Sequence, residues 1–393
     1  MVPNSSEFGK PMVDDQAWLD GAAGSNRQSR IVVSAEALRH NLAVARRFSP
    51  GSRFLATIKA NGYGHGAVAV AQVLSTPPGP NDTDGYRPAD GFNVVTLAEA
   101  LALRRAGIDA PIMVLQGLRE EGDLVHFVEH HLWPVVHASE QWAWYRKAPL
   151  ARELFTWLKV DTGMGRLGVP PEEATAILAD TPASDRVRGV MTHLACADVP
   201  GNAHTREQLE RFAAIRSLAG EARADSIANS AAVLAWPEAQ ADWARPGILL
   251  YGANPLVEPL PAGVKLVPAM TVTAPLVSVR EFRQGQGVGY GQHWHAPEAM
   301  PVGHVGIGYG DGLPRLLGED ADVRLGGVAC RVLGRVSMDS IAIDLRAVDA
   351  KYRQVGQAVT IWGPDNPVDR LAHAAGTISY ELLTGIRGRI ACQ

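Results

Sequence analysis

The sequence predicts an α/β protein with a TIM-like (β/α)8 barrel over residues 30–260 and a mainly β C-terminal domain over residues 261–393. Short apolar runs alternate with helical patterns up to residue 252, and short β-like runs separated by Gly and Pro follow residue 255. Repeated βα units require a parallel sheet with crossovers, and about eight of them favour a closed barrel. An open doubly wound sheet is the alternative that this pattern leaves open.

The predicted barrel contains eight strands, separated mostly by helical patterns. They are expected at 54–60, 91–96, 110–117, 132–137, 155–160, 186–194, 225–230 and 248–252. Helices are expected at 65–74, 97–107, 120–131, 139–148 and 205–220, and Gly107 is typical of a helix end. In the second domain β-like runs cover 267–279, 302–309, 327–336 and 341–345, and a helical pattern begins at Leu371. Residues 255–261 are the expected connector.

Composition excludes several classes of protein. The 37 basic and 41 acidic side chains give a net charge of −4, which argues against a nucleic-acid binder. No apolar run reaches the ~18 residues of a membrane span. Cys196, Cys330 and Cys392 are too few for a disulfide framework and indicate a reducing compartment. Residues 1–29 resemble an expression leader and an N-terminal extension without a secretory signal, so a cytoplasmic protein is expected.

Candidate chemistry is expected where the barrel strands end, because barrel enzymes place their sites there. Lys59 follows the first strand, and three of the next seven residues are glycines that allow a ligand to approach the backbone. A partly desolvated lysine has a lowered pKa and can form a Schiff base, although a solvated rim charge is the alternative. Ser230 and the backbone near Gly247 suit a phosphate, or form an ordinary βα turn.

Three other patterns suggest chemistry less specifically. The Asp161-Thr162-Gly163 triplet matches aspartic proteases, but it occurs once and inside the βα series. The H-x-x-E-H pattern from His126 to His130 matches a zinc-protease helix, but an exposed polar face of an outer helix is the preferred interpretation, and no metal site is expected. In the second domain the tyrosines between glycines and the segment 336–339 do not identify a site by themselves.

Eight short motifs, taken together, are specific. In chain order they are IKANGYGHG, KVDTGMGRLG, NSAA, RPGILLYG, VGYG, GYGDG, VSMD and TISY. They resemble the alanine racemase family over about residues 30–390. The resemblance implies a pyridoxal 5′-phosphate (PLP) enzyme that interconverts L- and D-alanine, supplies D-alanine for peptidoglycan and works as a homodimer with shared active sites. Serine or broad-specificity racemases and PLP-dependent amino-acid decarboxylases of the same fold are the alternatives.

The resemblance also implies a role for each matching residue. Lys59 is expected to hold the cofactor and Arg245 to face its pyridine nitrogen. The expected phosphate ligands are Tyr63, Ser230, Gly247, Ile248 and Tyr380. Tyr290 resembles the second catalytic base, contributed by the other subunit, and His193 is expected to hydrogen-bond both Tyr290 and Arg245.

The remaining roles concern the substrate. Arg166, and Met338 from the partner chain, are expected to hold the substrate carboxylate, and Tyr309 and Tyr380 to narrow the entrance. Lys159 matches a lysine that is often carbamylated in the family and positions Arg166.

The chemistry needs these residue types. Racemisation removes the α-proton from one face of the carbon and returns a proton to the other, so two positioned bases are required. An arginine cannot give up its proton to the pyridine nitrogen, which should limit side reactions such as transamination. Decarboxylases usually place a carboxylate at that position, so Arg245 argues against them. A non-catalytic PLP carrier would not need the second domain.

Overall fold

The computed structural model describes residues 29–80, 82, 85–181, 187–220, 223–317 and 320–386, together with the backbone of 391–392. The chain divides into two compact units, Ser34–Ala269 on the one hand and Met1–Val33 with Met270–Gln393 on the other. Of the leader and extension expected at residues 1–29, residues 1–28 lie outside the described residues, and so does the side chain of Cys392. Within the described part of the chain, no helix has the length and apolar character that crossing a membrane demands.

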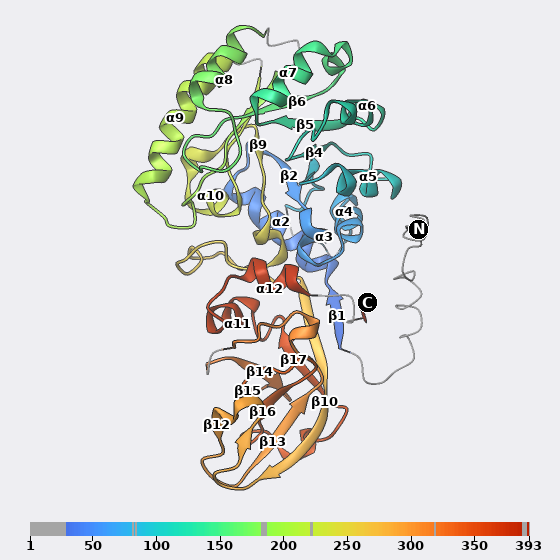
Figure 1. Ribbon diagram of the computed structural model, residues 1–393, viewed down its shortest axis with the longest axis vertical. Helices are drawn as coiled ribbons and strands as arrows, with labels where there is room; N and C mark the ends of the chain where they lie inside the picture. The colour runs from blue at the N-terminus through green and yellow to red at the C-terminus, as the bar shows by residue number, and fades with distance from the viewer. Residues whose placement is uncertain are drawn as a thin grey trace, which may run out of the picture. The chain divides into compact units, whose positions relative to one another are not determined.

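The first unit is a closed parallel barrel of eight strands with helices outside it (Figure 1). The strands are β2 (Arg53–Thr57), β3 (Gly91–Val94), β4 (Ile112–Val114), β5 (Leu132–Val136), β6 (Thr156–Lys159), β7 (Val187–Met191), β8 (Ala224–Ser226) and β9 (Trp243–Ala244). The barrel closes where β9 pairs with β2, with Arg53 opposite Trp243. This closure confirms the TIM-like barrel and excludes the open sheet.

The helices of this unit alternate with the barrel strands. They are α2 (Ala35–Phe48), α4 (Ala67–Ser75), α5 (Leu97–Arg105), α6 (Leu124–Glu129), α7 (Ser139–Lys147), α8 (Pro171–Ala179), α9 (Ala203–Ala219) and α10 (Ser230–Ala235). Of these, α4, α5, α6, α7 and α9 lie where helices were expected, whereas α2, α8 and α10 were not expected. Side chains from six different strands fill the barrel, so its interior is a packed core rather than a channel. They are Leu55, Met113, Val135, Trp157, Met191 and Trp243.

The eighth strand is not where the sequence predicted it. The run 248–252 was expected to be a strand, but Ile248–Tyr251 is a short 3-10 helix, η4, and the eighth strand is the two-residue β9 before it. All four residues of η4 are buried. A short, fully buried apolar run has the same hydrophobic pattern in a strand as in a helix, so periodicity could not separate the two.

The second unit is built on an eight-stranded sheet in the order β13-β16-β15-β14-β17-β10-β1-β18. Its strands are β1 (Arg30–Val33), β10 (Met270–Phe282), β13 (Met300–Val305), β14 (Asp322–Leu325), β15 (Val328–Leu333), β16 (Ile341–Asp344), β17 (Ala358–Trp362) and β18 (Ala391–Cys392). The long β10 pairs with β17 along one part and with β13 along another. This antiparallel pairing confirms the mainly β domain.

Two features of the second unit differ from the sequence-based expectation. Residues 30–33, which we expected in the barrel, form β1 and pair antiparallel with β10, with Ile31 opposite Val272. The strands β14 and β17 were not expected, and each is only four or five residues long. Two helices, α11 (Val368–Ala374) and α12 (Ser379–Gly385), complete the unit.

Candidate active site

Lys59 begins a left-handed turn directly after the first barrel strand. The segment α3 (Lys59–Tyr63) has positive φ at Ala60 (51°), Asn61 (53°), Gly62 (62°) and Tyr63 (52°). Each left-handed residue with a side chain costs roughly 1–2 kcal/mol, and such strain is concentrated at functional sites. The turn after β2 therefore keeps a backbone conformation that its residues with side chains do not intrinsically prefer, which marks this place as a candidate functional site.

Side chains outside the turn stabilise this shape. The carboxylate of Glu99 accepts the backbone N–H of Ala60 at 2.8 Å, and its other oxygen accepts those of Val95 and Thr96 at the start of α5. The Asn61 side chain accepts the N–H of Ala67 at 3.0 Å. Burial lowers the pKa of the Lys59 ammonium, the charge of Arg166 lowers it further, and Glu99 opposes both effects. Lys59 is therefore held in place and biased toward the neutral amine that a nucleophile requires.

A cradle of small groups lies where β8 and β9 end. The hydroxyl of Ser230, the first residue of α10, accepts the N–H of Gly247 at 2.7 Å and that of Leu249 at 3.3 Å. A Cβ at Gly247 would overlap the Tyr63 hydroxyl and lie 3.1 Å from its Cζ. The loops after the first, seventh and eighth barrel strands thus meet at this point, and their hydroxyl and N–H groups suit a phosphate.

Arg245 is buried next to this cradle, and no acidic side chain among the described residues hydrogen-bonds to it. Its guanidinium donates to the hydroxyl of Ser226, to the carbonyl of Thr192 at 2.6 Å and to that of Ile227 at 3.3 Å. Burial lowers its pKa to about 10, so it remains a cation at neutral pH. These three neutral oxygens orient the guanidinium and leave its charge uncompensated.

Lys159 and His193 lie within the field of the same cations. Burial lowers the pKa of the Lys159 ammonium to about 8, and the charges of Arg245, Arg166 and Lys59 contribute to this. Burial and then Arg245 lower the pKa of His193 well below its usual value, so the imidazole is neutral at pH 7. Within the described part of the chain the Arg245 guanidinium donates to Ser226, Thr192 and Ile227, and its expected hydrogen bond with His193 stays a prediction.

The loop after β6 carries Arg166 and is fixed by Asp161. One carboxylate accepts the N–H groups of Gly163 at 2.9 Å, Met164 at 2.8 Å and Gly165 at 3.0 Å. Burial raises the pKa of Asp161, but these bonds outweigh it and lower the pKa overall. A carboxylate committed to three amides is an anchor and not one half of a protease dyad, so the aspartic-protease match has no catalytic geometry here.

The remaining expected site residues belong to the second unit. Tyr290 lies on η5 (Tyr290–Gln292), and Tyr290 and Met338 are 69% and 52% exposed. Tyr309 donates its N–H to the Ser337 carbonyl at 3.0 Å, which brings it next to Met338. Tyr380, on α12, is also exposed. The structure therefore gathers Lys59, Tyr63, Lys159, Arg166, His193, Ser230, Arg245, Gly247 and Ile248 in the barrel and presents the other expected residues on the second unit.

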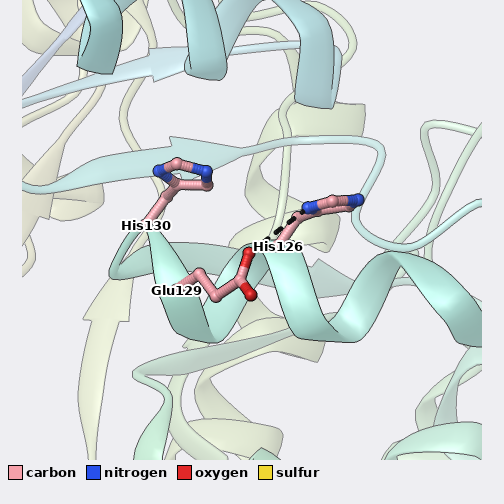
Figure 2. A group of neighbouring side chains, drawn as sticks. All are labelled: His126, Glu129 and His130. Carbon is pink, nitrogen blue, oxygen red and sulfur yellow. Dashed lines mark ion pairs between the residues drawn. The ribbon is translucent and has the colours of Figure 1, made fainter.

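The H-x-x-E-H pattern forms an exposed cluster on the outside of the barrel. Figure 2 shows His126, Glu129 and His130 at the end of α6, with an ion pair of 3.7 Å between His126 and Glu129. Because β5 begins two residues later, at Leu132, the cluster lies at the amino-terminal edge of the barrel, opposite the edge that carries Lys59. In the zinc-protease motif the glutamate is the base, and among the described residues no further ligand joins the two histidines.

Sequence reasoning missed the residues that support the site. The Thr96-x-x-Glu99 spacing is a capping-box signature that could have identified Glu99. Nothing in the local sequence identifies Gln208 on α9, whose contacts with the loops after β6 and β7 depend on the folded barrel.

The fold is that of a barrel enzyme, and its candidate site places Lys59 beside a cradle that suits an anionic group. Comparison with known proteins identifies the family. The chain matches the family descriptions "Alanine racemase, N-terminal domain" over residues 33–255 and "Alanine racemase, C-terminal domain" over residues 269–393. It is 42% identical to the alanine racemase of Shewanella woodyi over 365 residues, which cover 92% of this chain and 98% of that protein. The chain belongs to the alanine racemase family and is an amino-acid racemase.

Solved structures agree with this assignment. The biosynthetic alanine racemase from Pseudomonas aeruginosa has a TM-score of 0.86 and 38% identity, covering 93% of this chain and 99% of that one. The alanine racemase from Bartonella henselae, solved with covalently bound pyridoxal phosphate, has a TM-score of 0.81 over 93% of this chain and 99% of that one. At 24% identity the latter supports the fold alone. The family to which the chain belongs is PLP-dependent.

Proposed function

We propose that this protein interconverts L-alanine and D-alanine with PLP held through Lys59, as a homodimer in which Tyr290 of each subunit acts in the site of the other. The observation that carries the proposal is the strained turn at Lys59 beside the cradle of Tyr63, Ser230 and Gly247. PLP, when bound, withdraws electrons from the substrate's α-carbon and so makes its proton removable.

The residues present fit this cofactor. The Ser230 hydroxyl and the backbone at Gly247 and Ile248 line a cradle that has no room for a Cβ at Gly247, and the Tyr63 hydroxyl closes it. We assign these groups to the phosphate, with Tyr380 as a further ligand. Arg245 is the group for the pyridine nitrogen, because its bonds to three neutral oxygens orient it and leave its charge available.

Lys59 and Tyr290 are the two bases. Burial and Arg166 lower the pKa of Lys59, which favours the free amine that can accept a proton on one face of the α-carbon. Tyrosine ordinarily titrates near pH ~10, so a tyrosine base for the other face needs cations close to it. Arg245, acting through the neutral imidazole of His193, would supply that positive charge, and the exposure of Tyr290 leaves it free to reach a partner's site.

Substrate selection rests on Arg166 and Met338, which we propose hold the substrate carboxylate, and on Tyr309 and Tyr380, which narrow the entrance. Arg166 is presented by a loop that Asp161 fixes at three amides. We further propose that the enzyme is cytoplasmic and supplies D-alanine for peptidoglycan. No observation favours decarboxylation, since the buried group expected at the pyridine nitrogen is an arginine and not a carboxylate.

The test is chiral chromatography of L-alanine incubated with wild-type protein, with Lys59→Ala and with the exposed control Lys147→Ala. We expect the wild type and the control to produce D-alanine and Lys59→Ala to lose nearly all activity. Borohydride reduction of the wild-type enzyme with PLP should place the cofactor on the peptide that contains Lys59. Racemisation by Lys59→Ala at the wild-type rate would overturn the proposal.

A further inference from the structure

Helix α9 directs three polar side chains at the two loops that carry His193 and Arg166. His204, Gln208 and Arg211 are separated by four and three residues, so they lie on one face of the helix. The loops follow β6 and β7, and because all barrel strands are parallel, both leave the barrel at the carboxyl edge, where Lys59 follows β2. The side chains on this face of α9 therefore contact the loops that position residues of the candidate site.

Gln208 is the centre of this face and is fully buried. Its amide oxygen accepts the N–H of Ala195 at 2.8 Å, and its amide nitrogen donates to the His193 carbonyl at 3.1 Å. The same nitrogen lies 3.4 Å from the Thr162 hydroxyl. The orientation of the amide is fixed, because an N–H needs an acceptor and a carbonyl needs a donor. One side chain thus fastens the turn after His193 and touches the loop after β6.

The network continues from Thr162 to the buried arginine. The Thr162 and Thr192 hydroxyls are 2.8 Å apart, and the Thr192 hydroxyl donates to the Val160 carbonyl at 3.0 Å. The Thr192 carbonyl accepts from Arg245 at 2.6 Å. Gln208 is therefore connected to Arg245 through two buried threonines.

The two flanking residues complete the contact with the Arg166 loop. Arg211 donates to the Thr162 carbonyl at 2.8 Å, and His204 is 2.8 Å from the Gly163 carbonyl. Both are partly exposed, with side-chain exposures of 47% and 39%, whereas Gln208 has none. Buried hydrogen bonds hold geometry more firmly than exposed ones, since water cannot replace a lost partner.

We infer that Gln208 is a positioning residue of the racemase, which sets the backbone of His193 and, through Thr162, the loop that presents Arg166. The inference rests on the proposed function of those two residues. Misplacement of a catalytic group by about 1 Å can cost about 10²-fold in rate. We therefore expect a loss of 10- to 100-fold in kcat/KM when Gln208 is removed, with kcat falling through His193 and KM rising through Arg166.

The test compares Gln208→Ala, Gln208→Met and Gln208→Glu with wild type and with the exposed α9 control Glu210→Ala. Protonated glutamate has the shape and the donor of glutamine, whereas glutamate as an anion would face the His193 carbonyl and repel it. The activity of Gln208→Glu relative to wild type should therefore rise as the pH falls, while that of Gln208→Met stays low at every pH. Purely structural damage would not produce this pH-dependent recovery.

Hydrogen exchange tests the positioning role of Gln208 independently of the racemase assignment. The peptides covering 161–168 and 192–197 should exchange faster in Gln208→Ala and Gln208→Met but not in Glu210→Ala, whether or not the wild type racemises alanine. Wild-type values of kcat and KM within twofold in all three variants, or unchanged exchange in both peptides, would overturn the inference. If Gln208→Ala does not fold, the relative pH profile of Gln208→Glu and the exchange of Gln208→Met decide the question in the same way.

Discussion

The cradle next to the lysine turn makes a quantitative prediction for Gly247→Ala. The new Cβ would overlap the Tyr63 hydroxyl, lie 3.1 Å from Tyr63 Cζ and lie 3.4 Å from Thr57 Cβ. Ordinary contacts between such atoms are ~3.5 Å or longer, so the hydroxyl must move by about 1 Å. The ring cannot simply swing away, because Tyr63 is buried and stacks on Tyr251 with ring centroids 4.7 Å apart.

Overpacking of this kind costs roughly 1–3 kcal/mol, and 1.4 kcal/mol is tenfold in an equilibrium constant. Since we place the displaced hydroxyl on the cofactor phosphate, we expect PLP to bind Gly247→Ala about 10- to 100-fold more weakly. The assay is titration of the apoenzyme with PLP, followed by absorbance. Gly51→Ala is the control, because a Cβ at Gly51 would have no neighbour within 4 Å.

A double-mutant cycle tests the cause. Tyr63→Phe removes the overlapping hydroxyl, so Gly247→Ala should weaken PLP binding much less in that background than in wild type. Additive effects of the two substitutions would mean that the Tyr63 hydroxyl does not transmit the change. An affinity for PLP within twofold of wild type in Gly247→Ala alone would refute the reasoning about the cradle.

Three further predictions follow from the site. Arg245→Glu should raise transamination relative to racemisation, measured as pyruvate formed per D-alanine, and an unchanged ratio would contradict the assigned role of the arginine. Burial, opposed by bonds to the Tyr63 and Gly62 carbonyls, lowers the pKa of His65 from 6.5 to about 4. The contribution of His65 to the free energy of unfolding is then intact above pH 6.5 and decreases by up to about 3 kcal/mol as the pH falls to 4. His65→Asn should therefore flatten the pH dependence of the free energy of unfolding, whereas the exposed control His126→Asn should not. Gly62→Ala should lower stability by about 1–2 kcal/mol, since φ is 62° and Ala67 lies 3.2 Å from the new Cβ; an unchanged melting temperature would show that the turn tolerates alanine.

Local patterns predicted most of the barrel and failed at one strand for a physical reason. Strands β2 to β8 are apolar runs between helices, and each was located within a few residues. β9 is two residues long and is followed by the buried run 248–251, which has the stronger apolar signal. The prediction placed the eighth strand at that run, because hydrophobic periodicity reports burial and not the backbone hydrogen bonds that define a strand.

The site could be predicted only where the residues that form it are neighbours in the sequence. The glycines after Lys59 indicated a close approach to the backbone, but not that Ala60 and Asn61 would also adopt positive φ. The support from Gln208 comes from a helix that begins only after the loop it holds. Contacts of this kind depend on the closure of the barrel, and neither the composition of the chain nor the spacing of its motifs predicts them.

The charges at the carboxyl edge of the barrel explain why two anions belong there. The four cations whose charges act on one another or on His193 are Lys59, Lys159, Arg166 and Arg245. Two acids oppose these charges: Asp161 acts on Lys159 and Glu99 acts on Lys59. The carboxylate of Asp161 is bound by backbone amides, and that of Glu99 by the lysine turn and the start of α5. Like charges in a partly buried site repel. Burial is the main cause of the lowered pKa values of both lysines, and the repulsion between the cations adds to it. In the function that we propose, a phosphate and a substrate carboxylate would relieve this repulsion, so the same cations that lower the pKa of Lys59 would also favour an anionic cofactor and an amino acid.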